Sequence, residues 1–126
     1  MDESTVRRIP PDERVEGPPT PGMTRKQAVA SERMWAGLVR TDAGMVSGWH
    51  HHGDFDTTIF VLSGAIRMEY GSAGTDRIDA GPGDFLHVMH GAVHRESNPT
   101  DDPADAVVVR SGTGESVVNV EGPAPT

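Results

Sequence analysis

The sequence predicts an all-β protein, built as a small antiparallel sandwich or barrel. Apolar and β-branched residues occur in short runs, as in strands, and almost no segment has the spacing of an amphipathic helix. The 15 glycines and 10 prolines are a high share of 126 residues, and many stand between these runs, where tight turns join strands. The length fits one domain with a single core.

Residues 1–22 are predicted to be a flexible arm. Charged residues separate three pairs that interrupt regular structure, Pro10-Pro11, Pro18-Pro19 and Pro21-Gly22. Such an arm is either disordered or extended across the surface of a partner. The segment 24–33 that follows is open between a short helix and a strand. At the other end, residues 121–126 are predicted to be a disordered tail.

Residues 23–120 are predicted to form the β-domain. The clearest strand is 65–70, because Ile66, Met68 and Tyr70 alternate with polar positions, as on a half-buried strand. The other predicted strands span 34–40, 57–62, 77–80, 85–89, 106–110 and 117–120. A small antiparallel barrel of such strands encloses a cavity into which side chains from distant parts of the chain can point.

The composition argues against several classes of function. The net charge of −8 disfavours nucleic acid and anionic membrane surfaces, which both need a basic face. The absence of cysteine excludes disulfides, thiolate ligands and a cysteine nucleophile. No apolar run approaches the roughly 20 residues of a membrane helix, and the first residues lack the apolar region of a secretory signal. We expect a cytoplasmic protein that binds a small molecule, and neither nucleic acid nor membrane.

The run His50-His51-His52 is the strongest functional signal, because it holds three of the six histidines. On an extended strand His50 and His52 point to the same face, about 6.5–7 Å apart at Cα, and His51 points away. Asp56 follows after a turn, and His94 can add a third imidazole from a facing strand. We predict a metal site formed by His50, His52, Asp56 and His94.

A site of three imidazoles and one carboxylate suits a divalent transition metal. Iron, manganese, nickel, zinc and copper all accept these ligands, and the sequence does not choose among them. Such a ligand set leaves coordination positions open on an octahedral ion. A substrate or dioxygen can bind at those positions.

Two patterns of residues occur in order along the chain. The first comprises Gly44, His50, His52, Asp56 and Gly64, and the second comprises Gly83, Met89-His90-Gly91, His94 and Asn98. Together they resemble the two motifs of the cupin superfamily, in particular of its small single-domain, quercetin-dioxygenase-like members. The resemblance implies a jelly-roll β-barrel with a metal bound inside. The fold class that we expect is therefore a small antiparallel jelly-roll β-barrel with an extended N-terminal arm.

Two positions depart from the motifs. The glutamate of the first motif is Asp56 here, or Thr57 if a spacing of four residues is applied. Aspartate is shorter by one methylene, so Asp56 can reach the ion either directly or through water. Met89 stands where the second motif has proline. Neither departure removes a histidine.

Several other polar residues have open roles. His87 lies in an apolar strand and points either into the core or into the cavity, whereas His90 is expected to face solvent. Arg67 and Arg95 are expected to face solvent, and an inward orientation of either would favour an anionic substrate. Asn98 is expected to hold a turn by bonding to backbone groups.

The resemblance implies an enzyme that acts on a small organic molecule at the metal, as a dioxygenase, isomerase, lyase or cyclase. A non-catalytic ligand-binding or sensor domain is the alternative, and a vestigial site is a third reading. Small cupins commonly pair, so the resemblance also implies a homodimer. In that dimer the N-terminal arm would cross to the neighbouring barrel.

Overall fold

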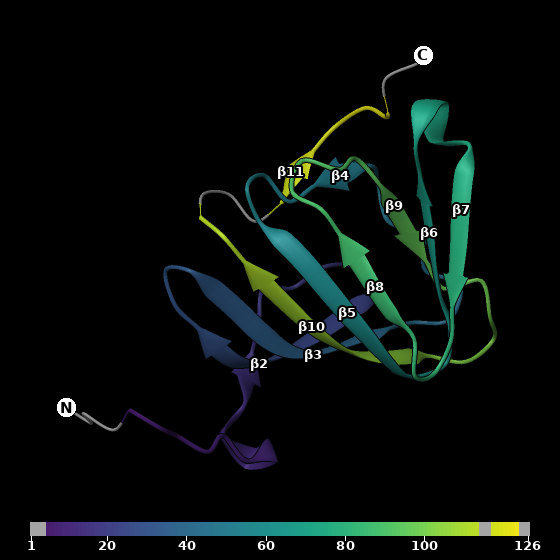
Figure 1. Cartoon of the computed structure of the whole chain (residues 1–126). Helices are drawn as coiled ribbons and strands as arrows, with labels where there is room; N and C mark the ends of the chain where they lie inside the picture. The colour runs from purple at the N-terminus through teal and green to yellow at the C-terminus, as the bar shows by residue number, and fades with distance from the viewer. Residues whose placement is uncertain (1–4, 114–116, 124–126) are drawn as a thin grey trace.

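The fold is antiparallel β-sheet (Figure 1). The computed structural model describes residues 5–113 and 117–123. The strands are β1 (Val15–Glu16), β2 (Met23–Ala30), β3 (Met34–Thr41), β4 (His50–His51), β5 (Asp56–Ser63), β6 (Ile66–Tyr70), β7 (Asp76–Ala80), β8 (Phe85–Val88), β9 (Arg95–Ser97), β10 (Ala104–Ser111) and β11 (Val118–Asn119). Two single turns of 3-10 helix, η1 (Pro11–Glu13) and η2 (Ser72–Gly74), complete the described elements. The all-β prediction is confirmed.

The strands form three sheets. A six-stranded sheet has the order β1-β2-β3-β10-β5-β8, a three-stranded sheet has the order β7-β6-β9, and β11 pairs with β4. Figure 1 shows the large sheet curving so that β6, β7 and β9 lie at one side of it. This arrangement, in which the six-stranded and three-stranded antiparallel sheets face each other, is consistent with the predicted jelly roll.

Strand β2 settles the segment that the sequence left open. Residues 23–30 pair along β3, from Met23 opposite Thr41 to Ala30 opposite Trp35. The segment forms a strand and not a helix because a strand pairs with the edge of β3, whose backbone groups would otherwise lack hydrogen-bond partners. The preceding β1 pairs with β2 in turn, so part of the predicted arm adds to the sheet. The flexibility of the arm stays a prediction, and its residues 1–4 lie outside the described residues, as do residues 124–126 of the predicted tail.

The core lies between the two larger sheets. Its buried apolar residues are Val39, Ile59, Val61, Ile66, Met68, Ala80, Leu86, Ala104, Ala106 and Val108. They come from both sheets, at alternate positions of their strands, as the period of two in a strand requires. The same alternation decides which polar side chains point inward beside the core.

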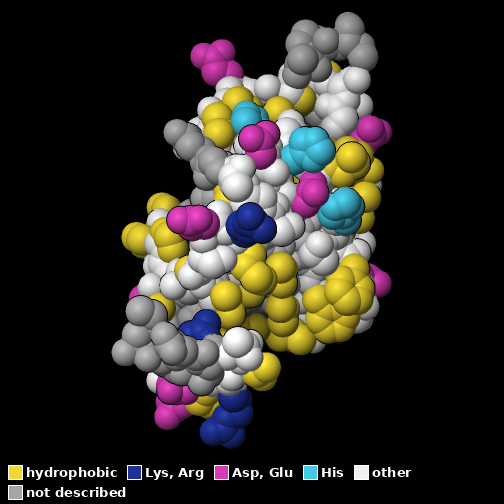
Figure 2. All heavy atoms as spheres, turned by 60° about the vertical axis from the view of Figure 1, so that its left-hand side comes forward, with side chains coloured by type: hydrophobic (Ala, Val, Ile, Leu, Met, Phe, Trp, Pro, Cys, Tyr) yellow, Lys and Arg dark blue, Asp and Glu magenta, His cyan; other side chains and the backbone are white. Residues whose placement is uncertain are grey.

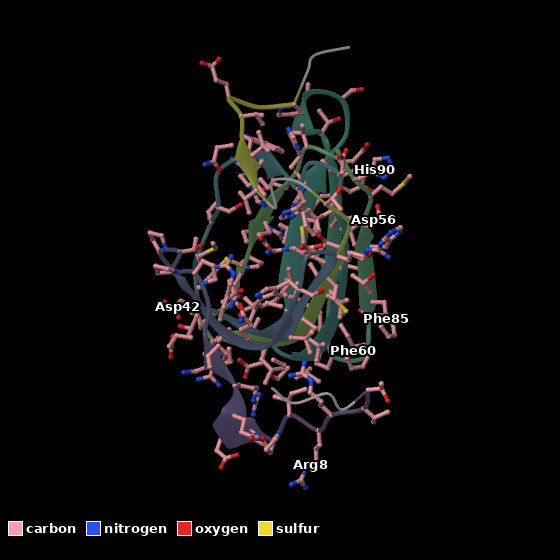
Figure 3. The ribbon with its side chains drawn as sticks, turned by 90° about the vertical axis from the view of Figure 1, so that its left-hand side faces the viewer. Arg8, Asp42, Asp56, Phe60, Phe85 and His90 are labelled. Atoms are coloured by element: carbon pink, nitrogen blue, oxygen red, sulfur yellow. The ribbon has the colours of Figure 1, made fainter. Side chains whose placement is uncertain are left out.

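The outer face of the large sheet carries exposed apolar side chains. Phe60 on β5 packs against Phe85 of the edge strand β8, with ring centroids 4.7 Å apart and the rings tilted by 49° (Figure 3). Figure 2 shows hydrophobic side chains gathered on this side of the molecule, with histidine and acidic side chains beside them. Within the described residues, no helix has the length and apolar character needed to cross a membrane.

Gly64 makes the tight connection between β5 and β6. Its φ is +76°, which disfavours residues with a side chain, and a Cβ built on it would lie 2.8 Å from the Cα of Ala104. Gly44, in the turn after β3, has the same φ of +76°, but nothing lies within 4 Å of its Cβ position. A substitution at either glycine therefore causes the same backbone strain, but only a substitution at Gly64 also causes a steric clash.

We predict that Gly64→Ala destabilises the protein more than Gly44→Ala does. The shared φ costs about 1–2 kcal/mol in each variant. The clash with Ala104 adds about 1–3 kcal/mol in Gly64→Ala alone. Urea unfolding of the two variants and the wild type measures the difference, and equal losses of stability would contradict the close approach.

Candidate metal site

Two segments that are far apart in the sequence form the frame of the site. The backbone N–H of Gly44 donates to Asn98 O at 2.8 Å at one end of this pairing. At the other end His50 and His94 exchange two backbone hydrogen bonds, of 3.0 and 2.9 Å. The residues of the two sequence motifs therefore face one another across an antiparallel pair.

The pairing brings together three of the four predicted ligands. His50, His52 and His94 are 8%, 4% and 3% exposed, and one ring nitrogen from each lies within 4.8 Å of the others. The ring centroids of His50 and His94 are 4.3 Å apart, and that of His52 lies 5.1 Å and 5.0 Å from them. Three buried imidazoles converge on one point inside the barrel.

Backbone carbonyls orient two of these rings. Nδ1 of His50 donates to Gly48 O at 2.9 Å, and Nδ1 of His94 donates to Ala92 O at 2.9 Å. A carbonyl only accepts, so the proton of each ring is on Nδ1 when the ring is neutral. The lone pair of Nε2 is then directed away from the backbone, as in histidines that bind metals.

The environment of His94 favours its neutral form. Burial lowers the pKa of His94, the hydrogen bond to Ala92 opposes that effect, and the neighbouring His50 lowers the pKa further. Neutral imidazole is the form that binds a metal ion.

The three histidines fit a divalent ion. An ion bound to two imidazoles at about 2.1 Å from each holds their nitrogens about 3.0–3.4 Å apart. The nitrogens here lie within 4.8 Å of one another, so the rings need to move closer together to bind one ion.

Asp56 does not join the cluster. It begins β5 and lies on its outer face, where its Oδ1 accepts a hydrogen bond from the backbone N–H of His90 at 2.8 Å. The ring Nδ1 of His90 lies 3.3 Å from the same oxygen, and Figure 3 shows both residues at the outer surface. The backbone N–H of His90, and next its ring, lowers the pKa of Asp56.

Thr57 is the inward-facing alternative at that position of the motif. Successive strand residues point to opposite faces, so Asp56 outside places Thr57 inside. Thr57 is 2% exposed, and its Oγ1 has no hydrogen-bond partner among the described residues. It lines a narrow inner cavity of about 20 Å³ together with His52 and His94. The barrel therefore holds a hydroxyl here rather than a carboxylate.

Glu96 is a site residue that the sequence reasoning missed. Its Oε1 lies 3.9 Å from Nε2 of His50, and its side chain is only 15% exposed. The period of two along a strand places residues 94 and 96 on one face, so the position of His94 already pointed to Glu96. The carboxylate at this site comes from the second motif segment instead of the first.

A cavity of about 440 Å³ opens beside the cluster. Its lining includes His50, His52 and Glu96, with Arg25 and Arg110 on the opposite strands and apolar side chains between them. This volume accommodates a small organic molecule.

Comparison with known proteins identifies the family. A family model described as a cupin domain matches residues 37–110, which is more than half of the chain. The chain belongs to the cupin family. The predicted superfamily is therefore confirmed, whereas the closer likeness to quercetin dioxygenases stays a prediction. No curated protein matches the chain.

Several solved structures have a similar fold. KdgF from Halomonas sp. is 23% identical over 86% of this chain and 96% of that chain, with a TM-score of 0.69. An uncharacterized conserved protein with a double-stranded β-helix domain from Klebsiella pneumoniae is 21% identical over 94% and 99%, with a TM-score of 0.70. Oxalate decarboxylase from Bacillus subtilis is 22% identical over 79% of this chain but 28% of that chain, with a TM-score of 0.65. These likenesses support the fold.

The other polar residues whose roles the sequence left open lie outside the histidine cluster. His87 and His90 are exposed. Arg67 pairs with Asp79 on β7, and Arg95 pairs with Glu69 on β6.

Asn98 holds a turn, as predicted. It is fully buried, its Nδ2 donates to the carbonyls of Thr41 and Asp102, and its Oδ1 accepts from Thr100. These bonds fasten the second motif segment to the end of β3.

Proposed function

We propose that this cupin holds one divalent transition metal ion through His50, His52 and His94. We propose further that it is an enzyme acting on a small organic molecule in the adjoining cavity. The observation that carries the proposal is the convergence of three buried imidazoles, two of which are oriented by backbone carbonyls. Three protein ligands leave positions open for a substrate, as in catalytic rather than structural sites.

The donor set is compatible with iron, manganese, nickel, zinc or copper. Manganese is the first ion to test, because the structurally similar oxalate decarboxylase from Bacillus subtilis contains Mn(II) centres. A bound ion of this kind supplies a Lewis acid that polarises an oxygen atom of the substrate.

Glu96 supplies the proton chemistry in this proposal. Its carboxylate lies beside Nε2 of His50 and lines the cavity, within reach of a molecule bound there. A carboxylate at such a place can take a proton from a carbon next to a polarised carbonyl group and return it elsewhere. This favours an isomerase, lyase or cyclase over a dioxygenase.

The alternative is a sensor or carrier that binds the same molecule without changing it. It would use the same histidines and the same cavity. The buried carboxylate beside the histidine cluster favours the enzyme, because a carrier of a small ligand has no need for a proton acceptor there.

We predict that metal binding depends on the three clustered histidines alone. His50→Ala, His52→Ala and His94→Ala should each lose most of the bound ion, because two imidazoles hold it far less tightly than three. Elemental analysis of untagged protein, loaded with manganese and desalted, measures the metal per chain. The wild type should hold about one ion.

Three variants outside the cluster serve as controls. His87→Ala, His90→Ala and Asp56→Asn should keep the metal content of the wild type, since the structure places these side chains on the outer surface. Loss of the ion in Asp56→Asn, or its retention in His94→Ala, would contradict the proposed ligand set.

We predict that Glu96→Gln keeps the metal but loses proton transfer. The assay follows exchange of carbon-bound protons by NMR, with the manganese-free, zinc-loaded protein and a panel of 2-oxo and 3-oxo compounds in D₂O. Removal of a positioned base should slow exchange by about 10²–10⁴-fold, whereas His90→Ala should leave it unchanged. Equal exchange by Glu96→Gln and the wild type would contradict the role of Glu96.

A further inference from the structure

Two arginines face the same cavity as the histidine cluster. Arg25 follows Met23 by two residues on β2, so its side chain lies on the inner face beside a residue that packs on the core. Arg110 is the next inward position of β10 after Ala106 and Val108. Both line the cavity of about 440 Å³ and also the narrow inner cavity beneath it.

Neither of these two arginines forms an ion pair with a carboxylate of the described residues. Arg40, Arg67 and Arg95 each form an ion pair with a carboxylate, at 2.8, 2.7 and 3.0 Å. Among the described residues, no carboxylate lies within 4.0 Å of the guanidinium of Arg25 or Arg110. Glu96 is the acid whose charge reaches both of them.

Of the two arginines, Arg110 has fewer hydrogen-bond partners among the described residues. Its Nε is buried and has no hydrogen-bond acceptor among the described residues. Its guanidinium carbon lies over the ring of Trp35, 5.6 Å from the centroid, within the range of a cation–π contact. The two terminal nitrogens of such a group can together bind both oxygens of a carboxylate.

Arg25 is already anchored at its other side. Its Nη1 donates to Thr20 Oγ1 at 2.7 Å and to Pro18 O at 3.1 Å, which are both neutral acceptors. These bonds fix the guanidinium without neutralising it. Burial lowers the pKa of both arginines, and the charge of Arg25 lowers that of Arg110 further.

A pair of like charges that is partly withdrawn from water is costly, and the chain as a whole has a net charge of −8. The positive charge beside the histidines is therefore specific to this cavity, since the chain as a whole is negative. Two guanidiniums against the single carboxylate of Glu96 leave a net positive charge. An anionic ligand would remove the imbalance.

We propose that the substrate is a small organic acid whose carboxylate is bound by Arg110 and Arg25, while another of its oxygens faces the three histidines. The inference deepens the proposed function, because it names the substrate class of the same site. The apolar side chains of Met23, Met45 and Val117 line the rest of the cavity and suit the carbon skeleton of such a molecule. The sequence left open whether Arg67 or Arg95 points inward. The arginines that line the cavity are instead Arg25 and Arg110.

The test measures binding by calorimetry to the manganese-loaded protein. The probes are succinate, pyruvate and glycolate, each beside its uncharged amide, together with inorganic phosphate. At least one acid should bind about tenfold or more tightly than its amide, since only the acid can pair with the arginines. Arg110→Met and Arg25→Met should each weaken that acid by about tenfold or more and keep the metal content of the wild type.

Arg40→Met is the matched control. It removes an arginine that pairs with Asp105 away from the cavity, so acid binding should stay at the wild-type level. Circular dichroism checks that each variant is folded. The comparison of acid with amide uses the wild type alone, so it tests the proposal even if a cavity variant fails to fold.

Three results would overturn the inference. The first is that none of the three acids binds more tightly than its amide. The second is that acid binding is unchanged in folded Arg110→Met and Arg25→Met. The third is that phosphate binds more tightly than all three acids. Failure of the wild type to load metal would contradict the proposed function instead, and metal analysis shows it before any acid is added. The acid and amide comparison is then made on the metal-free protein, where the arginines should still prefer the acid.

Discussion

The site depends on one antiparallel pairing, between residues 44–50 and 94–98. His50 and His94 exchange two backbone hydrogen bonds across it, which fixes the distance between their rings before any ion is present. His52 follows His50 by two residues and returns to the same face. The peptide carbonyls of Gly48 and Ala92 then set the orientation of two imidazoles. A preformed arrangement of this kind lowers the entropy lost when a metal ion binds.

Strand alternation explains which polar groups share the cavity. Glu96 lies one inward position beyond His94, and Arg110 lies one beyond Val108. Thr57 faces inward and its neighbour Asp56 faces outward. The barrel thus combines three imidazoles, one carboxylate and two guanidiniums around a small volume, while most of the acidic residues lie on the outer surface. This contrast is the basis on which we propose a small anionic substrate.

The sequence predicted the β-fold and the shared face of His50 and His52 because both depend on local patterns, whereas His94 came from the second motif, far along the chain. Short apolar runs between glycines specify strands, and the spacing of His50 and His52 specifies a shared face. The choice between Asp56 and Thr57 depended on the phase at which β5 begins, and a shift of one residue exchanges the two faces. Glu96 was within reach of the same alternation argument. Arg25 was not, because the segment around it was equally compatible with a helix until its pairing with β3 was known.

The central claim is that His50 and His94, each through Nε2, bind a single divalent ion together with His52. Nitrogen-15 NMR of the zinc-loaded protein tests it directly, because the ring nitrogens of each histidine report which one carries the proton and which one the metal. The account predicts a proton on Nδ1 and zinc on Nε2 for His50 and His94, with His52 as the third zinc-bound ring. A proton on Nε2 of His50 or His94, or zinc bound to fewer than these three rings, would contradict it.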